Sequence, residues 1–164
     1  MALFLTDKDI ATLLAECKPF PADWRTRAML KPKRGHRERE FDVKGESESQ
    51  FRVILRQAVW NPFDFSVILG LLVPKTNQIF RVLRCNGKSH EHTNRIEGAS
   101  FYDFHIHRAT ERYQKEGFPE DGYAEVTDKY SNFDGAFETL ISDGGCVRPS
   151  TPQLDLDLGG GGSP

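Results

Sequence analysis

The sequence lacks an apolar run long enough to cross a membrane. The longest candidate, Phe65 to Val73, is interrupted by Ser66 and Gly70 and falls well short of the ~18 residues that a membrane span requires. At the N-terminus, five apolar residues run directly into the charged segment 6–9, which is unlike a secretory signal peptide. We therefore expect a cytoplasmic protein with no membrane association.

Cysteine is scarce, and the way it is spaced excludes two classes of site. Cys17, Cys85 and Cys146 are odd in number, far apart, and form no CxxC pair. This pattern argues against a disulfide framework and against a zinc knuckle. We expect three reduced thiols in a reducing compartment.

Several catalytic motifs are also missing. The chain has no phosphate-binding P-loop, no G-x-G-x-x-G and no G-x-S-x-G, which argues against nucleotide hydrolysis, dinucleotide chemistry and α/β-hydrolase catalysis. The net charge is only −2, but it is unevenly distributed. Residues 25–56 hold ten basic and five acidic side chains, whereas residues 120–157 hold two basic and nine acidic ones. The basic stretch can attract phosphate or simply keep the surface solvated.

Alternation of apolar and polar residues dominates the middle of the chain. Phe51, Val53 and Leu55 alternate with polar positions, the period of a half-buried strand, and similar patterns continue to residue 107. Thr6 has the chemistry of a helix N-cap, and residues 131–142 carry an apolar stripe at helical spacing. The sequence predicts an α+β fold, with an antiparallel β-sheet meander of five to six strands, an N-terminal helix and a C-terminal helix.

The predicted single domain covers residues 1–145. Residues 146–164 combine proline, serine and threonine with Leu-Asp alternation and a glycine run, so we expect a disordered tail whose last six residues resemble an added linker. Residues 23–39 are irregular and basic. Gly70 predicts a bulge in its strand or a close backbone approach, and Asn86-Gly87 predicts a type I′ turn.

A histidine cluster is the densest group of titratable side chains. Four of the five histidines fall within 18 residues, as the pairs His90 with His92 and His105 with His107. An H-x-H pair in a strand projects from one face, and paired strands lie only ~4.8 Å apart. Neighbouring pairs would therefore bring three or four imidazoles together. Such a group suits proton transfer and metal binding equally well.

A metal site is one interpretation of the cluster. His90 and His92, with His105 or His107, would bind a divalent metal, and Glu97 or Asp103 would supply an oxygen ligand. The H-x-H-x4-E spacing from His90 to Glu97 resembles the first metal motif of cupins. However, Gly87 stands too close to the first histidine, and the second cupin motif is absent.

Metal-independent cleavage of RNA is the interpretation that we prefer from the sequence, and it requires no cofactor. Two histidines would act as general base and general acid on the phosphodiester, and a carboxylate would orient one of them. The expected catalytic residues are His92, His105, His107, His90 and Asp103. The expected substrate-binding residues, whose charge would stabilise the phosphorane, are Arg84, Lys88, Arg95 and Arg108.

A structural role is the third interpretation. His92, Thr93 and Asn94 would hold a long loop to a strand through side-chain-to-backbone hydrogen bonds. His105 and His107 would then be exposed on a sheet face. The chain would in that case be a non-enzymatic interaction protein, such as a phage or bacterial inhibitor that binds a protein partner.

Five short motifs resemble those of a family of small uncharacterised bacterial and phage proteins. In chain order they are Lys18-Pro19-Phe20, Lys31-Pro32-Lys33-Arg34-Gly35, Val82-Leu83-Arg84, His92-Thr93-Asn94 and His105-Ile106-His107. The chain is also distantly similar to the TumE-type toxins of bacterial toxin–antitoxin pairs, which have an Arg-aromatic strand, an Asn-containing turn and a late histidine pair. That resemblance implies a growth-inhibiting toxin or defence-related protein directed at nucleic acid and neutralised by an antitoxin-like partner.

Overall fold

A seven-stranded antiparallel sheet forms the centre of the molecule in a computed structural model, which describes residues 2–150. The fold class expected from the sequence is confirmed, although the main sheet has seven strands instead of five or six. In spatial order the strands are β10 (Tyr123–Val126), β9 (His105–Arg108), β6 (Ile79–Asn86), β5 (Phe65–Leu72), β4 (Gln50–Ala58), β3 (His36–Lys44) and β2 (Lys31–Lys33).

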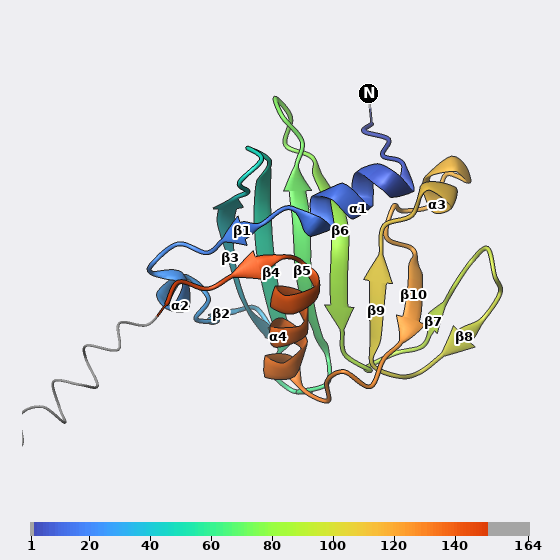
Figure 1. The fold of residues 1–164 in the computed structure, drawn as a ribbon. Coiled ribbons are helices and arrows are strands. Elements are labelled where there is room, and N and C mark those ends of the chain that lie inside the picture. Colours follow the sequence, from blue (N-terminus) through green and yellow to red (C-terminus); the bar gives the residue numbers. More distant parts are fainter. Residues whose placement is uncertain (1, 151–164) are drawn as a thin grey trace, which may run out of the picture.

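Within residues 2–150, four helices and two small sheets complete the fold (Figure 1). The helices are α1 (Asp7–Ala15), α2 (Trp24–Arg27), α3 (Glu111–Lys115) and α4 (Phe133–Asp143). The small sheets pair β1 (Lys18–Pro19) with β11 (Cys146–Val147), and β7 (His92–Thr93) with β8 (Ser100–Phe101). Among the described residues, no helix combines the length and the apolar character that crossing a membrane would need.

Both expected terminal helices are present and begin at the side chains that favour capping. The Thr6 hydroxyl accepts from the Asp9 amide, and the Asp9 carboxylate accepts from the Thr6 amide, which completes a capping box. Helix α1 ends at Ala15, before the proline at position 19. At the other end of the chain, the Asn132 side chain accepts from the Gly135 amide and starts α4.

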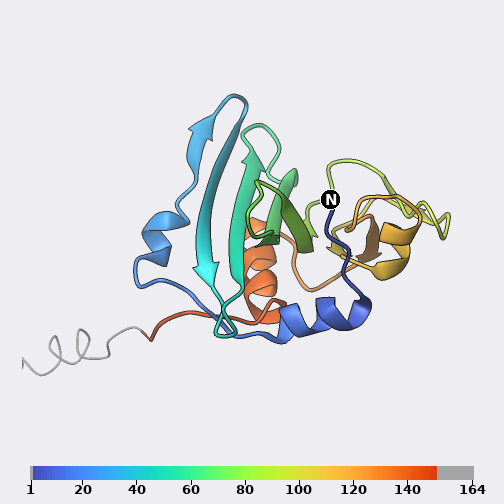
Figure 2. The same ribbon diagram turned by 90° about the horizontal axis from the view of Figure 1, so that it is seen from above.

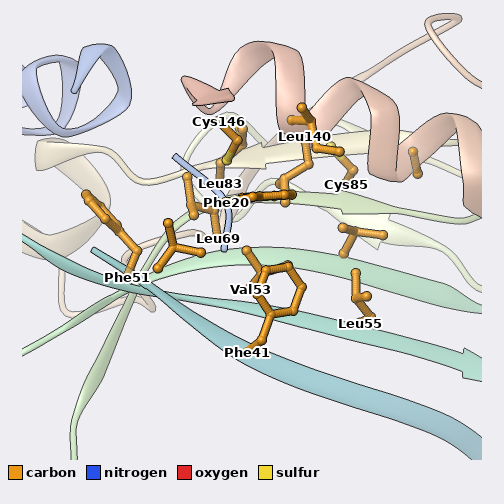
Figure 3. Close-up of a cluster of buried hydrophobic side chains, with 14 of the residues drawn as sticks. Phe20, Phe41, Phe51, Val53, Leu55, Leu69, Leu83, Cys85, Leu140 and Cys146 are labelled. Atoms are coloured by element: carbon orange, nitrogen blue, oxygen red, sulfur yellow. The ribbon is translucent and has the colours of Figure 1, made fainter. Parts of the chain in front are cut away.

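The core lies between the sheet and the helices α1 and α4, which cover the same side of it (Figures 1 and 2). Phe51, Val53 and Leu55 of β4 are 0% exposed, so the alternation in the sequence marks the buried face correctly. Leu140 points from α4 toward Leu83 of β6 in the buried cluster (Figure 3). The opposite face of the sheet carries the even-numbered side chains of β4.

Two local expectations need correction. Residues 23–39, expected to be irregular, form α2, β2 and the start of β3, because β2 pairs with β3 through backbone hydrogen bonds that need no apolar pattern. Gly35, with φ of 73°, makes the turn between them. Asn86-Gly87 does not form a type I′ turn, since neither residue has a positive φ.

Gly87 and Gly70 each lie where neighbouring atoms leave little room for a side chain. A Cβ on Gly87 would lie 1.8 Å from the Phe63 carbonyl oxygen, so the residue permits a close backbone approach. The register of β5 against β6 shifts between Leu69 and Gly70, and the extra residue, Val82, lies in β6, so Gly70 faces a bulge in the neighbouring strand. A Cβ on Gly70 would lie 2.4 Å from Cγ2 of Ile79. The expected tail from residue 146 is corrected at its start, because Cys146–Val147 forms β11; residues 151–164 lie outside the described part.

The buried face of β4 can be tested against its opposite face. Leu55→Ala should lower the free energy of unfolding by about 2–5 kcal/mol, because it opens a cavity in the core. Ile54→Ala, on the half-buried side of the same strand, should cost only about 1 kcal/mol. Urea denaturation of the two variants checks this, and equal losses would contradict the assignment of faces.

Candidate functional site

Three histidines converge where β7 approaches β9. One nitrogen from each of His92, His105 and His107 lies within 4.8 Å of the corresponding nitrogen of the other two. The ring centroids are 5.3 Å apart for His92 and His105, 4.7 Å for His92 and His107, and 4.9 Å for His105 and His107. These are the three histidines that the sequence placed first among its catalytic candidates.

Strand β9 places two members of the cluster. His105 and His107 are two residues apart, so both project from the face opposite Ile106, which packs into the core. They lie directly across from Asn86 and Arg84 of β6. Their exposed fractions are 2% and 3%, which contradicts the expectation that, in a structural role, they would be exposed.

Asn94 places the third member. Its side-chain amide donates to the Ala124 carbonyl at 2.8 Å, and its side-chain oxygen accepts from the Ala124 amide at 2.9 Å. This pair of bonds joins the loop after β7 to the edge strand β10 and decides which side-chain atom is the oxygen. Nε2 of His92 lies 2.9 Å from that oxygen, so it must donate, and Nδ1 keeps its lone pair.

Main-chain carbonyl groups hold the other two rings in the complementary tautomer. Nδ1 of His105 donates to the Asp103 carbonyl at 2.7 Å, and Nδ1 of His107 donates to the Asp121 carbonyl at 2.8 Å. Nε2 is therefore the atom with the lone pair in both rings. Each of the three imidazoles thus has one nitrogen that donates to an oxygen and one that carries a lone pair. Nε2 of His107 also lies 3.5 Å from the side-chain nitrogen of Asn86, which can donate weakly to it.

Burial keeps the two β9 histidines neutral. It lowers the pKa of His105 to about 4, and the neighbouring His92 and Arg84 lower it further against the effect of the Asp103 carbonyl. Burial likewise lowers the pKa of His107 to about 2, followed by the charges of Arg84 and His105. Neutral imidazole is the form that binds metal ions.

A buried ion pair borders the cluster. Nε of Arg84 lies 3.1 Å from Oδ2 of Asp121, and Nε of Arg81 lies 3.5 Å from Oδ1. Burial raises the pKa of the Asp121 carboxyl, and both arginines oppose that shift. The close approach of Arg84 lacks the angle of a hydrogen bond, so both Asp121 oxygens remain without a hydrogen-bond donor among the described residues.

A pocket of about 320 Å³ opens over these groups. Its lining consists of Arg81, Arg84, Asn86, His90, His92, Thr93, Arg95, His105, His107, Pro119, Asp121 and Gly122. Three basic side chains and one carboxylate therefore face the space in front of the imidazoles. This composition suits an anionic ligand.

The remaining candidates from the sequence divide into two groups. Arg84, Arg95 and His90 line the pocket. Lys88 does not line it, and its ammonium group lies over the rings of Phe63 and Phe104. Arg108 follows His107 in β9 and so points to the other face of the sheet.

Asp103 and Glu97, the two carboxylates proposed from the sequence, have other roles in the structure than the expected ones. Asp103 contributes its main-chain oxygen to His105. Glu97, the oxygen ligand suggested by the cupin-like spacing, accepts hydrogen bonds from Tyr113 and Arg112 and is not part of the three-histidine group.

Asp121 is the residue that the sequence did not single out. It lies in a Pro-Glu-Asp-Gly turn 14 residues after His107, and only the folding of this turn over β6 brings it to Arg84. No comparison, whether with protein-family models, curated proteins or solved structures, finds a match for this chain. The geometry of the pocket is therefore the basis for assigning a function.

The lowered pKa values predict a pH dependence of stability. Between pH 6.5 and 5 the unfolded chain binds protons at His105 and His107 that the folded chain does not bind, so the free energy of unfolding should fall as pH falls. Each histidine contributes a slope of up to about 1.4 kcal/mol per pH unit. Chemical denaturation in a metal chelator measures it. The double variant His105→Gln, His107→Gln should show a flatter profile, and an equally steep one would contradict the assignment.

Proposed function

We propose that His92, His105 and His107 bind one divalent transition metal ion, and that the protein uses this centre to hydrolyse phosphodiester bonds in RNA. The observation that carries the proposal is the convergence of three imidazoles that each offer a nitrogen within 4.8 Å of the other two. In each ring one nitrogen is hydrogen-bonded to an oxygen atom and the other carries a lone pair. Hydrogen bonding of this kind, often to a backbone carbonyl, is what orients metal-binding histidines in proteins.

The donor set favours a catalytic centre over a purely structural one. Three histidine ligands leave a coordination position open for water, as in catalytic zinc sites, whereas structural zinc sites use four protein ligands. The nitrogens lie within 4.8 Å of one another, and a bound metal would have to draw them closer to form bonds of ~2.0–2.1 Å. A metal held here would lower the pKa of bound water and neutralise phosphate charge.

The polar residues around the cluster have roles that suit phosphate chemistry. Arg84 is positioned to stabilise negative charge that develops on the phosphoryl oxygens. The Asp121 carboxylate, buried and without a hydrogen-bond donor in the described chain, can accept a proton from the attacking water. Its main-chain oxygen orients His107 at the same time. Arg95 and His90 lie in the same pocket lining and can contact the flanking phosphate groups.

Metal-independent cleavage, the mechanism expected from the sequence, is the second candidate. It needs a protonated imidazole to donate to the leaving oxygen. The pKa values of His105 and His107 lie far below neutrality, so this role would fall to His90, which is exposed and lines the pocket. The two mechanisms make opposite predictions for activity in the presence of a chelator.

The cellular role in this proposal is that of a cytoplasmic toxin or defence-related protein. RNA cleavage would arrest growth, and a partner of the antitoxin kind would prevent it. This part rests on the distant similarity to TumE-type toxins, through an Arg-aromatic strand, an Asn-containing turn and a late histidine pair. A non-enzymatic inhibitor that binds a protein partner would need none of the metal or cleavage chemistry.

Metal content tests the centre directly. After incubation with Zn²⁺, Mn²⁺ or Fe²⁺ and removal of excess, the protein should retain about one ion per chain, measured by elemental analysis. His105→Ala and His107→Ala should each lose it. His36→Ala is the matched control, because this histidine lies on β3 and bonds to Glu38. Absence of stoichiometric metal in the wild type would refute the centre.

Cleavage tests the reaction. The metal-loaded protein should cleave single-stranded RNA, and Arg84→Gln should lower kcat by on the order of a hundredfold while retaining the metal. Arg108→Gln, on the other face of the sheet, should match the wild type. Activity that persists in excess chelator would exclude the metal mechanism in favour of the metal-independent one, and loss of that activity in His90→Ala would support its acid role.

A further inference from the structure

The face of the sheet opposite the helices is open beside the candidate site. On β4 this face carries Arg52, Ile54 and Arg56, which alternate with the buried core residues. Helices α1 and α4 both lie on the other side of the sheet (Figures 1 and 2). The described residues therefore leave a surface next to the histidine cluster that no helix covers.

A row of polar residues runs from the cluster to β4 on this side of the sheet; its first two members, His105 and Asn86, are buried, and it becomes accessible at Ser66 and Arg56. His105 lies opposite Asn86, Asn86 opposite Ser66, and Ser66 opposite Arg56 on successive strands. The Ser66 hydroxyl donates to the Asn86 side-chain oxygen at 2.9 Å. Three strand spacings separate the ends of the row, a distance of about 14 Å.

A second hollow lies at the far end of this row. It encloses about 330 Å³, and its polar lining includes Arg34, His36, Arg56, Asp64 and Ser66. Ser66 thus borders this hollow, and its hydrogen-bond partner Asn86 borders the pocket of the histidine cluster. One hydrogen-bonded pair is all that separates the two hollows along the row.

The arginines of the second hollow are available to a ligand. Arg34 and Arg56 are exposed, and neither makes an ion pair with another described residue. Arg52 on the same face differs, because its guanidinium is held by Asp42 at 2.6 Å and lies 3.5 Å from Glu40. Two unpaired guanidinium groups against the single carboxylate of Asp64 leave this hollow suited to phosphate.

We propose that this face is a binding track for single-stranded RNA, which runs from the histidine cluster across Asn86 and Ser66 to a phosphate subsite at Arg34 and Arg56. The track deepens the proposed function and rests on it for the position of the cleaved bond.

The track also has an apolar component. Ile54 and Ile68 lie directly opposite each other on β4 and β5, and Ile68 lies opposite Arg84 on β6. Both isoleucines are half-buried on the open side of the sheet. Bases of a single strand can pack on this surface while the phosphates follow the polar row, because unpaired bases expose their apolar faces.

Length dependence tests the track. Binding of a fluorescent 12-nucleotide RNA to the full chain is measured by anisotropy in excess chelator, which prevents metal-dependent turnover. Arg34→Ala and Arg56→Ala should each weaken binding by on the order of tenfold and reduce the salt dependence by about one phosphate contact. Arg52→Ala is the matched control and should bind like the wild type. Cleavage of a dinucleotide by the metal-loaded protein should be unchanged in both variants.

The outcomes separate this inference from the proposed function. Binding that depends on Arg34 and Arg56 without any cleavage by the metal-loaded protein would support the track and refute the nuclease. Cleavage with equal affinity for dinucleotide and 12-nucleotide RNA, or an Arg56→Ala variant that binds like the wild type, would refute the track alone. Tighter binding of duplex RNA or of single-stranded DNA of the same length would refute the assignment to single-stranded RNA.

Discussion

The candidate site depends on the position of β9 between β6 and β10. This pairing buries Ile106 in the core and therefore obliges His105 and His107 to face the other side, next to Arg84 and Asn86. The neighbour β10 then holds Asn94 through both main-chain groups of Ala124, which brings His92 to the same point. A shift of β9 by one residue would turn both of its histidines into the core.

Burial has a cost that the hydrogen bonds of the site offset. An imidazole without water needs a partner for its N–H group, and each ring of the cluster finds one on a carbonyl oxygen from the main chain or from Asn94. The same bonds decide the tautomers, so the second nitrogen of each ring carries a lone pair. Stability and ligand-binding capacity thus come from one set of contacts.

Much of the fold could be predicted because it follows from local patterns. Thr6 and the apolar stripe of residues 131–142 marked the terminal helices, and the alternation around Val53 marked the buried face. Strand β2 escaped prediction because an edge strand pairs through its backbone, and its sequence Lys31-Pro32-Lys33 carries no apolar signal. The prediction of a turn at Asn86-Gly87 was wrong, because this glycine is required by the close approach of the Phe63 backbone, a tertiary contact.

The sequence by itself showed where histidines are concentrated enough to form a site, because the H-x-H spacing places His105 and His107 on one face of any strand. Only the tertiary structure decided that His92 joins them and that His90 stays at the rim. It also decided that Asp121 approaches Arg84 while Arg108 faces away. The physical reason is that these relations depend on strand order and on how two loops fold over the sheet, and neither is encoded in the local period of the sequence.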